Sequence, residues 1–110
     1  MSPSTDYVIY LAGPMTGYEN FNYPAFNEAA KLLRSHDYTV INPAENFDGR
    51  TDLPRSTYIR EAVKQVADAD MLVLLPGWKN SAGAYLEFQI AIATDIVIAN
   101  YEDLVRDLSV

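Results

Sequence analysis

Residues 71–94 read MLVLLPGWKNSAGAYLEFQIAIAT, and this stretch decides the fold. Its first residues, Met71–Leu75, are all apolar and stop at Pro76-Gly77, which predicts a buried strand closed by a turn. The segment from Gly83 to Thr94 predicts a helix, and Ser81 is well placed to cap its amino end. A wholly apolar strand that leads into a helix is typical of parallel sheets covered by helices.

The rest of the chain continues this alternation of strand and helix. Strands are predicted at residues 7–12, 38–42 and 96–99, helices at 22–34, 56–68 and 101–108, and a polar loop at 44–54. The pattern predicts an α/β fold, a small doubly wound parallel sheet (Rossmann-like or flavodoxin-like) with helices on both faces, as a single domain over residues 1–110. In such sheets, ligands bind beyond the carboxyl ends of the strands.

Composition limits the classes of function. The chain has 110 residues, a formal net charge of −7, no cysteine and one histidine, His36. The negative charge disfavours binding to a nucleic-acid polymer, and the lack of Cys and of further His favours neither a metal site nor a cofactor. No apolar run reaches the roughly 20 residues that a membrane helix needs, and no signal peptide is recognised, so we expect a cytoplasmic protein that does not bind membranes. Since a chain this short buries a small share of its surface, we also expect a homodimer or higher homo-oligomer.

The predicted helix at 83–94 holds the most informative acid. Glu87 is the only charged residue between Ser81 and Ala93, and a helix with so few polar residues is expected to be largely buried. A buried carboxylate is rarely kept without a partner or a function, although Glu87 could also lie at the rim of a packed face. The turn with Ser81 and Gly83 is suited to hold a phosphate or sugar hydroxyl at the helix amino end, unless Ser81 only caps its own helix.

Other candidate residues lie beside the first and third strands. Residues 13–17, GPMTG, form a loop after the first strand that can bring backbone N–H groups to a ligand, without a dinucleotide or nucleoside-triphosphate fingerprint. Asp70 opens the third strand, at the end away from the expected crevice, where a turn residue is the simpler interpretation. Four aromatic residues that follow the loop can stack a nucleobase or pack in the core: Tyr18, Phe21, Tyr23 and Phe26.

Three of these features together resemble the nucleoside 2-deoxyribosyltransferase-like superfamily. They are Tyr10–Pro14 at the end of the first strand, Asp70 at the third, and Ser81-x-Gly83-x-x-x-Glu87 at the helix. The resemblance covers nearly the whole chain. Within the superfamily, the stretch from Pro76 to Ala84 is most similar to a small, mostly phage-associated branch described as a domain of unknown function.

The resemblance implies chemistry at a glycosidic bond, with no metal and no cofactor. Glu87 matches the nucleophile that forms a covalent sugar ester, Tyr10 the hydroxyl that hydrogen-bonds it, and Asp70 the acid near the departing base. The resemblance also implies homo-oligomers whose sites borrow residues from a neighbouring subunit. Expected substrate-binding residues are Gly13, Pro14, Met15, Gly17, Ser81 and Gly83.

The residue at Ser81 favours a phosphorylated substrate. In the resembled family, a serine at this position suits a 5′-phosphate, whereas transferases that act on free nucleosides tend to have Asp there. Two differences from the resembled family argue against a phosphorylated substrate. Tyr85 stands where the relatives often have a second glycine, and the loop at 13–17 lacks the arginine of the monophosphate hydrolases. Lys79 is the candidate for the missing charge. We therefore expect a hydrolase that releases free base from (deoxy)nucleoside 5′-monophosphates. The alternatives are a base-exchanging transferase, a catalytically silent nucleotide-binding or sequestering module, and a purely structural interaction protein.

Overall fold

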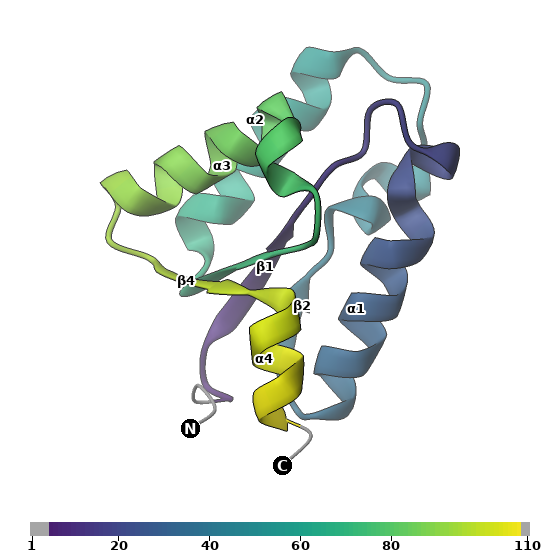
Figure 1. The fold of residues 1–110 in the computed structure, drawn as a ribbon. Coiled ribbons are helices and arrows are strands. Elements are labelled where there is room, and N and C mark those ends of the chain that lie inside the picture. Colours follow the sequence, from purple (N-terminus) through teal and green to yellow (C-terminus); the bar gives the residue numbers. More distant parts are fainter. Residues whose placement is uncertain (1–4, 109–110) are drawn as a thin grey trace.

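The computed structural model describes residues 5–108 and has one parallel sheet at its centre (Figure 1). The strands follow the order β2-β1-β3-β4, and each neighbouring pair is parallel. Their bounds are β1 Val8–Ala12, β2 Thr39–Ile41, β3 Met71–Leu74 and β4 Val97–Asn100. The predicted α/β class is therefore confirmed.

Helices cover both faces of this sheet. Helices α1 (Tyr23–Ser35) and α4 (Tyr101–Leu108) pack on one face, and α2 (Arg55–Asp68) and α3 (Ala82–Ala93) pack on the other (Figure 1). Short 3₁₀ turns lie between these elements: η1 at Glu19–Asn22, η2 at Pro43–Gly49 and η3 at Trp78–Asn80. The segment expected as a polar loop at 44–54 thus begins with a 3₁₀ turn.

Alternation along β1 decides which side chains meet which helices. Successive residues of a strand point to opposite faces. Ile9 and Leu11 belong to the core with α1 and α4, whereas Tyr10 and Ala12 belong to the core with α2 and α3. All four are completely or almost completely buried. Because Tyr10 faces the second layer, its long side chain reaches toward α3.

The sheet order creates a switch point between β1 and β3. The chain runs from β1 to β2 on one side of β1 and then continues with β3 and β4 on the other side. Ligands of open parallel sheets bind beyond the carboxyl ends of the strands at such a point. The loop after β1 and the turn that leads into α3 both lie there.

The expectation that α3 is largely buried is wrong. Ala84 and Ala91 are its buried residues, while the large apolar side chains of Tyr85, Leu86 and Ile92 are 46%, 38% and 57% exposed. The helix contacts the sheet and α2 through a narrow stripe, so its remaining apolar surface faces outward in the single chain. Composition alone does not distinguish a helix that packs within its own chain from one whose apolar surface packs against another chain.

Two kinds of feature are absent from residues 5–108. Within this range, no helix is long and apolar enough to cross a bilayer. The same range holds no group of three or more His, Cys, Asp or Glu side chains arranged to bind a metal ion.

Candidate functional site

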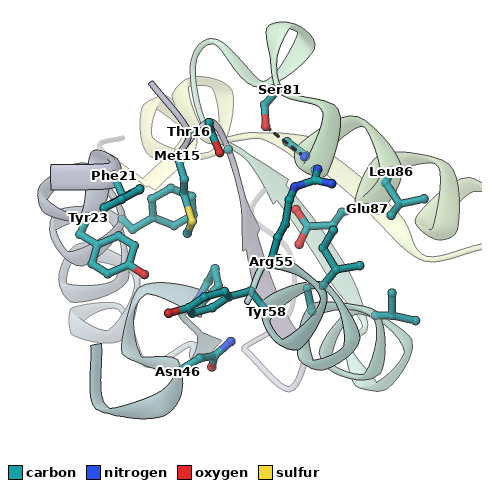
Figure 2. Close-up of a pocket in the computed structure, with 18 of the residues that line it drawn as sticks. Met15, Thr16, Phe21, Tyr23, Asn46, Arg55, Tyr58, Ser81, Leu86 and Glu87 are labelled. Atoms are coloured by element: carbon teal, nitrogen blue, oxygen red, sulfur yellow. Dashed lines mark hydrogen bonds between the residues drawn. The ribbon is translucent and has the colours of Figure 1, made fainter. Parts of the chain in front are cut away.

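A cavity of about 290 Å³ opens at the carboxyl end of β1 (Figure 2). Its walls come from β1 and the loop after it, from η1 and α1, from the segment that follows β2, and from α2 and α3. These elements are distant in sequence, and the parallel topology brings their ends together. The cavity thus occupies the place where the sheet order predicts a ligand.

Tyr10 and Glu87 form a hydrogen-bonded pair inside this cavity. The Tyr10 hydroxyl on β1 donates a hydrogen bond to Oε2 of Glu87 on α3. Tyr10 is fully buried, and the backbone of β1 fixes its direction. A residue of the strand therefore orients a carboxyl group of the helix.

Burial changes the acidity of both groups. Burial of the Glu87 carboxyl raises its pKa to about 7, although the hydrogen bond from Tyr10 acts in the opposite direction. Burial, the nearby Glu87 and its hydrogen bond, and the more distant Glu61 raise the pKa of Tyr10 well above its usual range. The tyrosine therefore remains a neutral donor, while Glu87 changes charge near neutral pH.

The amino end of α3 forms another part of the cavity wall. The Ser81 hydroxyl accepts a hydrogen bond from the Ala84 backbone N–H at 3.2 Å, so the expected cap is present (Figure 2). Apart from its two chain neighbours and the backbone of its own helix, no heavy atom of residues 5–108 lies within 4 Å of the position that a Cβ would take at Gly83. The first N–H groups of a helix lack partners within it, and those of Ala82 and Gly83 make no hydrogen bond with the described residues. They are available to an anion or a hydroxyl.

Aromatic side chains line another part of the cavity. Phe21, Tyr23 and Phe26 come from η1 and α1, and Tyr58 comes from α2 (Figure 2). The Tyr58 hydroxyl donates to the Arg50 carbonyl oxygen at 2.7 Å and accepts from the Leu53 N–H at 3.1 Å. These two bonds fix the segment before α2. The aromatic faces give a planar base a surface on which to stack.

Six of the nine residues predicted for the site line the cavity, and three do not. Those that line it are Tyr10, Gly13, Met15, Ser81, Gly83 and Glu87. Gly13 also has a packing role, because an added Cβ would lie 2.8 Å from the Cβ of Leu75. Pro14 accepts a hydrogen bond from Asn22 at its carbonyl oxygen, and Gly17 adopts a positive φ of 87° in a turn. These two residues shape the loop and are not part of the cavity wall.

Asp70 requires a correction. Its carboxylate accepts a hydrogen bond from the Val8 backbone N–H at 2.8 Å, at the amino ends of β1 and β3. The cavity lies at the carboxyl ends of these strands, so the structure does not bring Asp70 together with Glu87. The direction of the strand predicts Asp70 at this end of the sheet, away from the ligand, whereas the resemblance predicts it beside the base. In the structure, Asp70 links the amino ends of the two central strands through this hydrogen bond.

Sequence reasoning also missed four polar residues that line the cavity: Asn46, Thr51, Arg55 and Tyr58. All four follow β2, whose carboxyl end lies at the same edge of the sheet as that of β1. Because ligands bind beyond the carboxyl ends of parallel strands, the position of these residues after β2 could have identified them from the sequence. Lys79, expected to supply a positive charge, instead lines a second cavity, and its ammonium lies 6.0 Å from the centre of the Trp78 ring.

Comparison with known proteins places the chain in a family. The solution structure of BlsM is similar to this fold, with a TM-score of 0.68 and 20% sequence identity over 94% of this chain and 74% of that chain. This similarity shows a shared fold. A search of curated proteins found no significant match. Residues 7–100 match the family described as Domain of unknown function (DUF4406), so the chain is a member of the DUF4406 family.

Proposed function

We propose that this protein cleaves the N-glycosidic bond of (deoxy)nucleoside 5′-monophosphates and releases the free base. The observation that carries the proposal is the Tyr10–Glu87 pair, an oriented carboxyl group inside a cavity at the switch point of the sheet. The fold shared with BlsM and the family match fit the resemblance to nucleoside 2-deoxyribosyltransferase-like proteins, which assigns Glu87 the role of nucleophile.

The reaction proceeds in two steps at the sugar. One carboxylate oxygen of Glu87 attacks C1′ and forms a C–O bond while the C1′–N bond breaks. The electron pair of the broken bond goes to the base nitrogen, which takes up a proton from water. A water molecule then attacks C1′ of the sugar ester, its proton passes to the hydroxide left by the first step, and the bond between C1′ and the Glu87 oxygen breaks. This regenerates the Glu87 carboxylate and releases the sugar phosphate with the original configuration at C1′.

Tyr10 positions the nucleophile and assists its ionisation. Its hydroxyl donates to Oε2, which leaves the second oxygen of the carboxylate for attack at C1′. Because this hydrogen bond opposes the effect of burial on the Glu87 pKa, it increases the ionised fraction at neutral pH. Only the ionised carboxylate is a nucleophile.

The two ends of the cavity suit the two ends of a nucleotide. The aromatic residues Phe21, Tyr23 and Tyr58 offer surfaces for the base. The open N–H groups at Ala82 and Gly83 suit a phosphate oxygen. Glu87 lies one helical turn after Gly83 on α3, so a sugar between the two ends has its C1′ near the carboxylate.

Product analysis tests this proposal. The purified protein and its Glu87→Gln variant are incubated with the common nucleosides and nucleoside 5′-monophosphates, with and without a second free base, and released base is measured by chromatography. The hydrolase predicts free base from a monophosphate with the wild-type protein alone. Product that requires a second base indicates the transferase instead. Rapid acid quench and intact-mass measurement then detect the sugar phosphate ester on the wild-type chain and not on Glu87→Gln.

One observation favours a binding module as the second candidate. Within the part of the chain that the structure describes, Glu87 is the only Asp or Glu that lines this cavity, since Asp70 lies at the amino ends of the strands. A pocket with one acid can hold a nucleotide without assisting the departure of its base. Saturable nucleotide binding with no base release in the screen would identify this second function.

We also propose that the protein acts as a homodimer through the surface of α2 and α3. Tyr85, Leu86 and Ile92 of α3 and Val63 of α2 are large apolar side chains that are 38–57% exposed. Leu86 and Val63 also line the cavity, so a second copy packed on this surface would cover its opening. Exposed apolar surface of this kind supports an interface between protein chains.

A further inference from the structure

We propose that Arg55 makes the cavity select a phosphorylated sugar over the unphosphorylated one. The inference rests on the proposed function in one respect: the sugar is taken to lie over Glu87. It assigns the phosphate contact to a residue of α2, outside both the loop after β1 and the turn before α3.

The first support is that, among residues 5–108, Arg55 is the only lysine or arginine that lines the cavity. Figure 2 shows its side chain pointing into the cavity, from the start of α2 toward the side formed by Ser81 and Glu87. The chain as a whole carries a net charge of −7 and repels anions at a distance. A local cation inside the cavity is therefore needed to favour a dianionic phosphate there.

The second support is that no described residue pairs with the charge of Arg55. Arg34, Arg50 and Arg106 form ion pairs with acids at 2.8, 3.0 and 3.0 Å. Arg55 forms no ion pair and its side chain no hydrogen bond with any residue of 5–108. Its guanidinium group carries a planar set of N–H donors that matches the oxygens of a phosphate.

The third support is that Arg55 does not neutralise the nucleophile. No ion pair joins it to Glu87, and an arginine in contact with that carboxylate would lower its pKa, whereas the pKa of Glu87 is raised. The two groups thus serve different parts of a ligand. Arg55 and the open N–H groups of Ala82 and Gly83 take the phosphate, and Glu87 takes C1′ of the sugar.

The distances along α3 agree with this division. Gly83 and Glu87 are four residues apart, which is about 6 Å along the helix axis. This is the scale of a ribose ring with its 5′ carbon. A sugar phosphate can therefore reach the amino end of α3 and Arg55 with its phosphate while its C1′ is at Glu87.

The test uses ribose 5-phosphate and ribose as probes, because these contain the phosphate and the sugar without requiring knowledge of the base. Dissociation constants are measured by calorimetry for the wild-type chain and for Arg55→Gln, Arg55→Lys and Arg60→Gln. Arg60 is a matched control, since it lies on the same helix, is exposed, and lies outside the cavity. Its substitution makes the same change in net charge.

The expected result has three parts. Wild-type protein binds ribose 5-phosphate at least about tenfold more tightly than ribose, Arg55→Gln weakens binding of ribose 5-phosphate by about tenfold or more, and Arg60→Gln changes it by less than about twofold. Arg55→Lys, which keeps the charge and loses the planar donors, is intermediate. Equal losses in Arg55→Gln and Arg60→Gln overturn the inference, as does a wild-type protein without preference for the phosphorylated sugar.

The same experiment separates this inference from the glycosidase proposal. Binding of ribose 5-phosphate that depends on Arg55, without base release from any nucleotide, sustains the phosphate contact and refutes the glycosidase. Base release from nucleosides that is as fast as from monophosphates, and unchanged in Arg55→Gln, sustains the glycosidase and refutes the phosphate contact.

Discussion

Glu87 is the residue on which the proposed chemistry depends. Its carboxyl is buried in the cavity, which disfavours the charged form, and it accepts a hydrogen bond from the neutral Tyr10 hydroxyl. Burial raises its pKa to about 7, and the Tyr10 hydrogen bond partly opposes that change. A nucleophile in this setting is about half ionised at pH 7 and largely ionised at higher pH. It is also little hydrated, so its attack on C1′ does not require the loss of a full shell of water.

The raised pKa of Glu87 predicts a pH-dependent cost in stability. The pKa is about 7 in the folded protein and near 4.5 in the unfolded chain, so the folded state binds the proton more tightly. Stability therefore falls as pH rises from about 4.5 through 7. Glu87→Gln removes this fall and is more stable than wild type above pH 7, by up to about 3 kcal/mol. Urea unfolding at pH 5 and pH 8 measures the difference. Identical pH dependence in both proteins would refute the assigned acidity.

Tyr10→Phe tests the role of the hydroxyl. The substitution keeps the buried ring and removes the donor to Glu87, so the pKa of Glu87 rises further. We expect the acid limb of the pH profile of kcat/KM for base release to move from about pH 7 to a higher pH, with a loss of about 10-fold to 100-fold at pH 7. A uniform loss at all pH values would show that the hydroxyl serves a different purpose.

Helix α3 is the element that joins the two parts of the site, because its amino end and Glu87 are on one helix. Gly83 has open space where a Cβ would stand, and its φ lies outside the positive range, so the backbone does not require glycine here. The absence of a side chain leaves the cavity open beside the first N–H groups of the helix. The account thus assigns Gly83 a role in ligand access and no role in folding.

The Gly83→Val variant tests whether Gly83 keeps the cavity open to the ligand. The Cβ of the added side chain stands in open space, so we expect the melting temperature to remain within a few degrees of wild type. Binding of ribose 5-phosphate falls by about tenfold or more because the side chain covers the amino end of the helix. Ala93→Val, at an exposed position near the other end of the same helix and outside the cavity, serves as the control. Equal effects of both substitutions on binding would contradict the assigned role.

Helices and strands could be predicted from the sequence more fully than the packing between them. The apolar run at Met71–Leu75 and the turn residues after it predicted the strand and the helix, because both signals are local. The exposure of α3 was not predictable, since apolar composition does not say which chain covers it. The sequence did not identify Arg55 as a cavity residue, because the position of its side chain depends on how α2 packs beside α3. The strand direction placed Asp70 correctly, and analogy misplaced it.

At the scale of the whole molecule, the exposed apolar surface of α2 and α3 is the feature that a single chain leaves unexplained. The exposed side chains that form it are Val63 of α2 and Tyr85, Leu86 and Ile92 of α3. The opposite face of the sheet is covered by α1 and α4, which present charged residues to solvent. The asymmetry supports association through the first surface and not through the second.

Ile92→Glu tests the association. Ile92 is 57% exposed, so a charged side chain is tolerated in the single chain, whereas it opposes burial in an interface. We expect analytical ultracentrifugation to show a dimer for wild type and an increase in dissociation constant of at least about tenfold for Ile92→Glu. Lys31→Gln on α1 gives the same change in charge on the opposite face and is expected to leave the dimer intact. A monomeric wild-type protein would refute the proposed homodimer.

Base release from nucleoside 5′-monophosphates by the wild-type protein and by Glu87→Gln, followed by chromatography, decides whether Glu87 is the nucleophile of a glycosidase. We expect free base with the wild-type protein and at least about a thousandfold lower rate with Glu87→Gln, whose amide cannot form the sugar ester. Equal rates from the two proteins, or no release by wild type from any monophosphate that it binds, would contradict the claim that Glu87 is the nucleophile of a glycosidase.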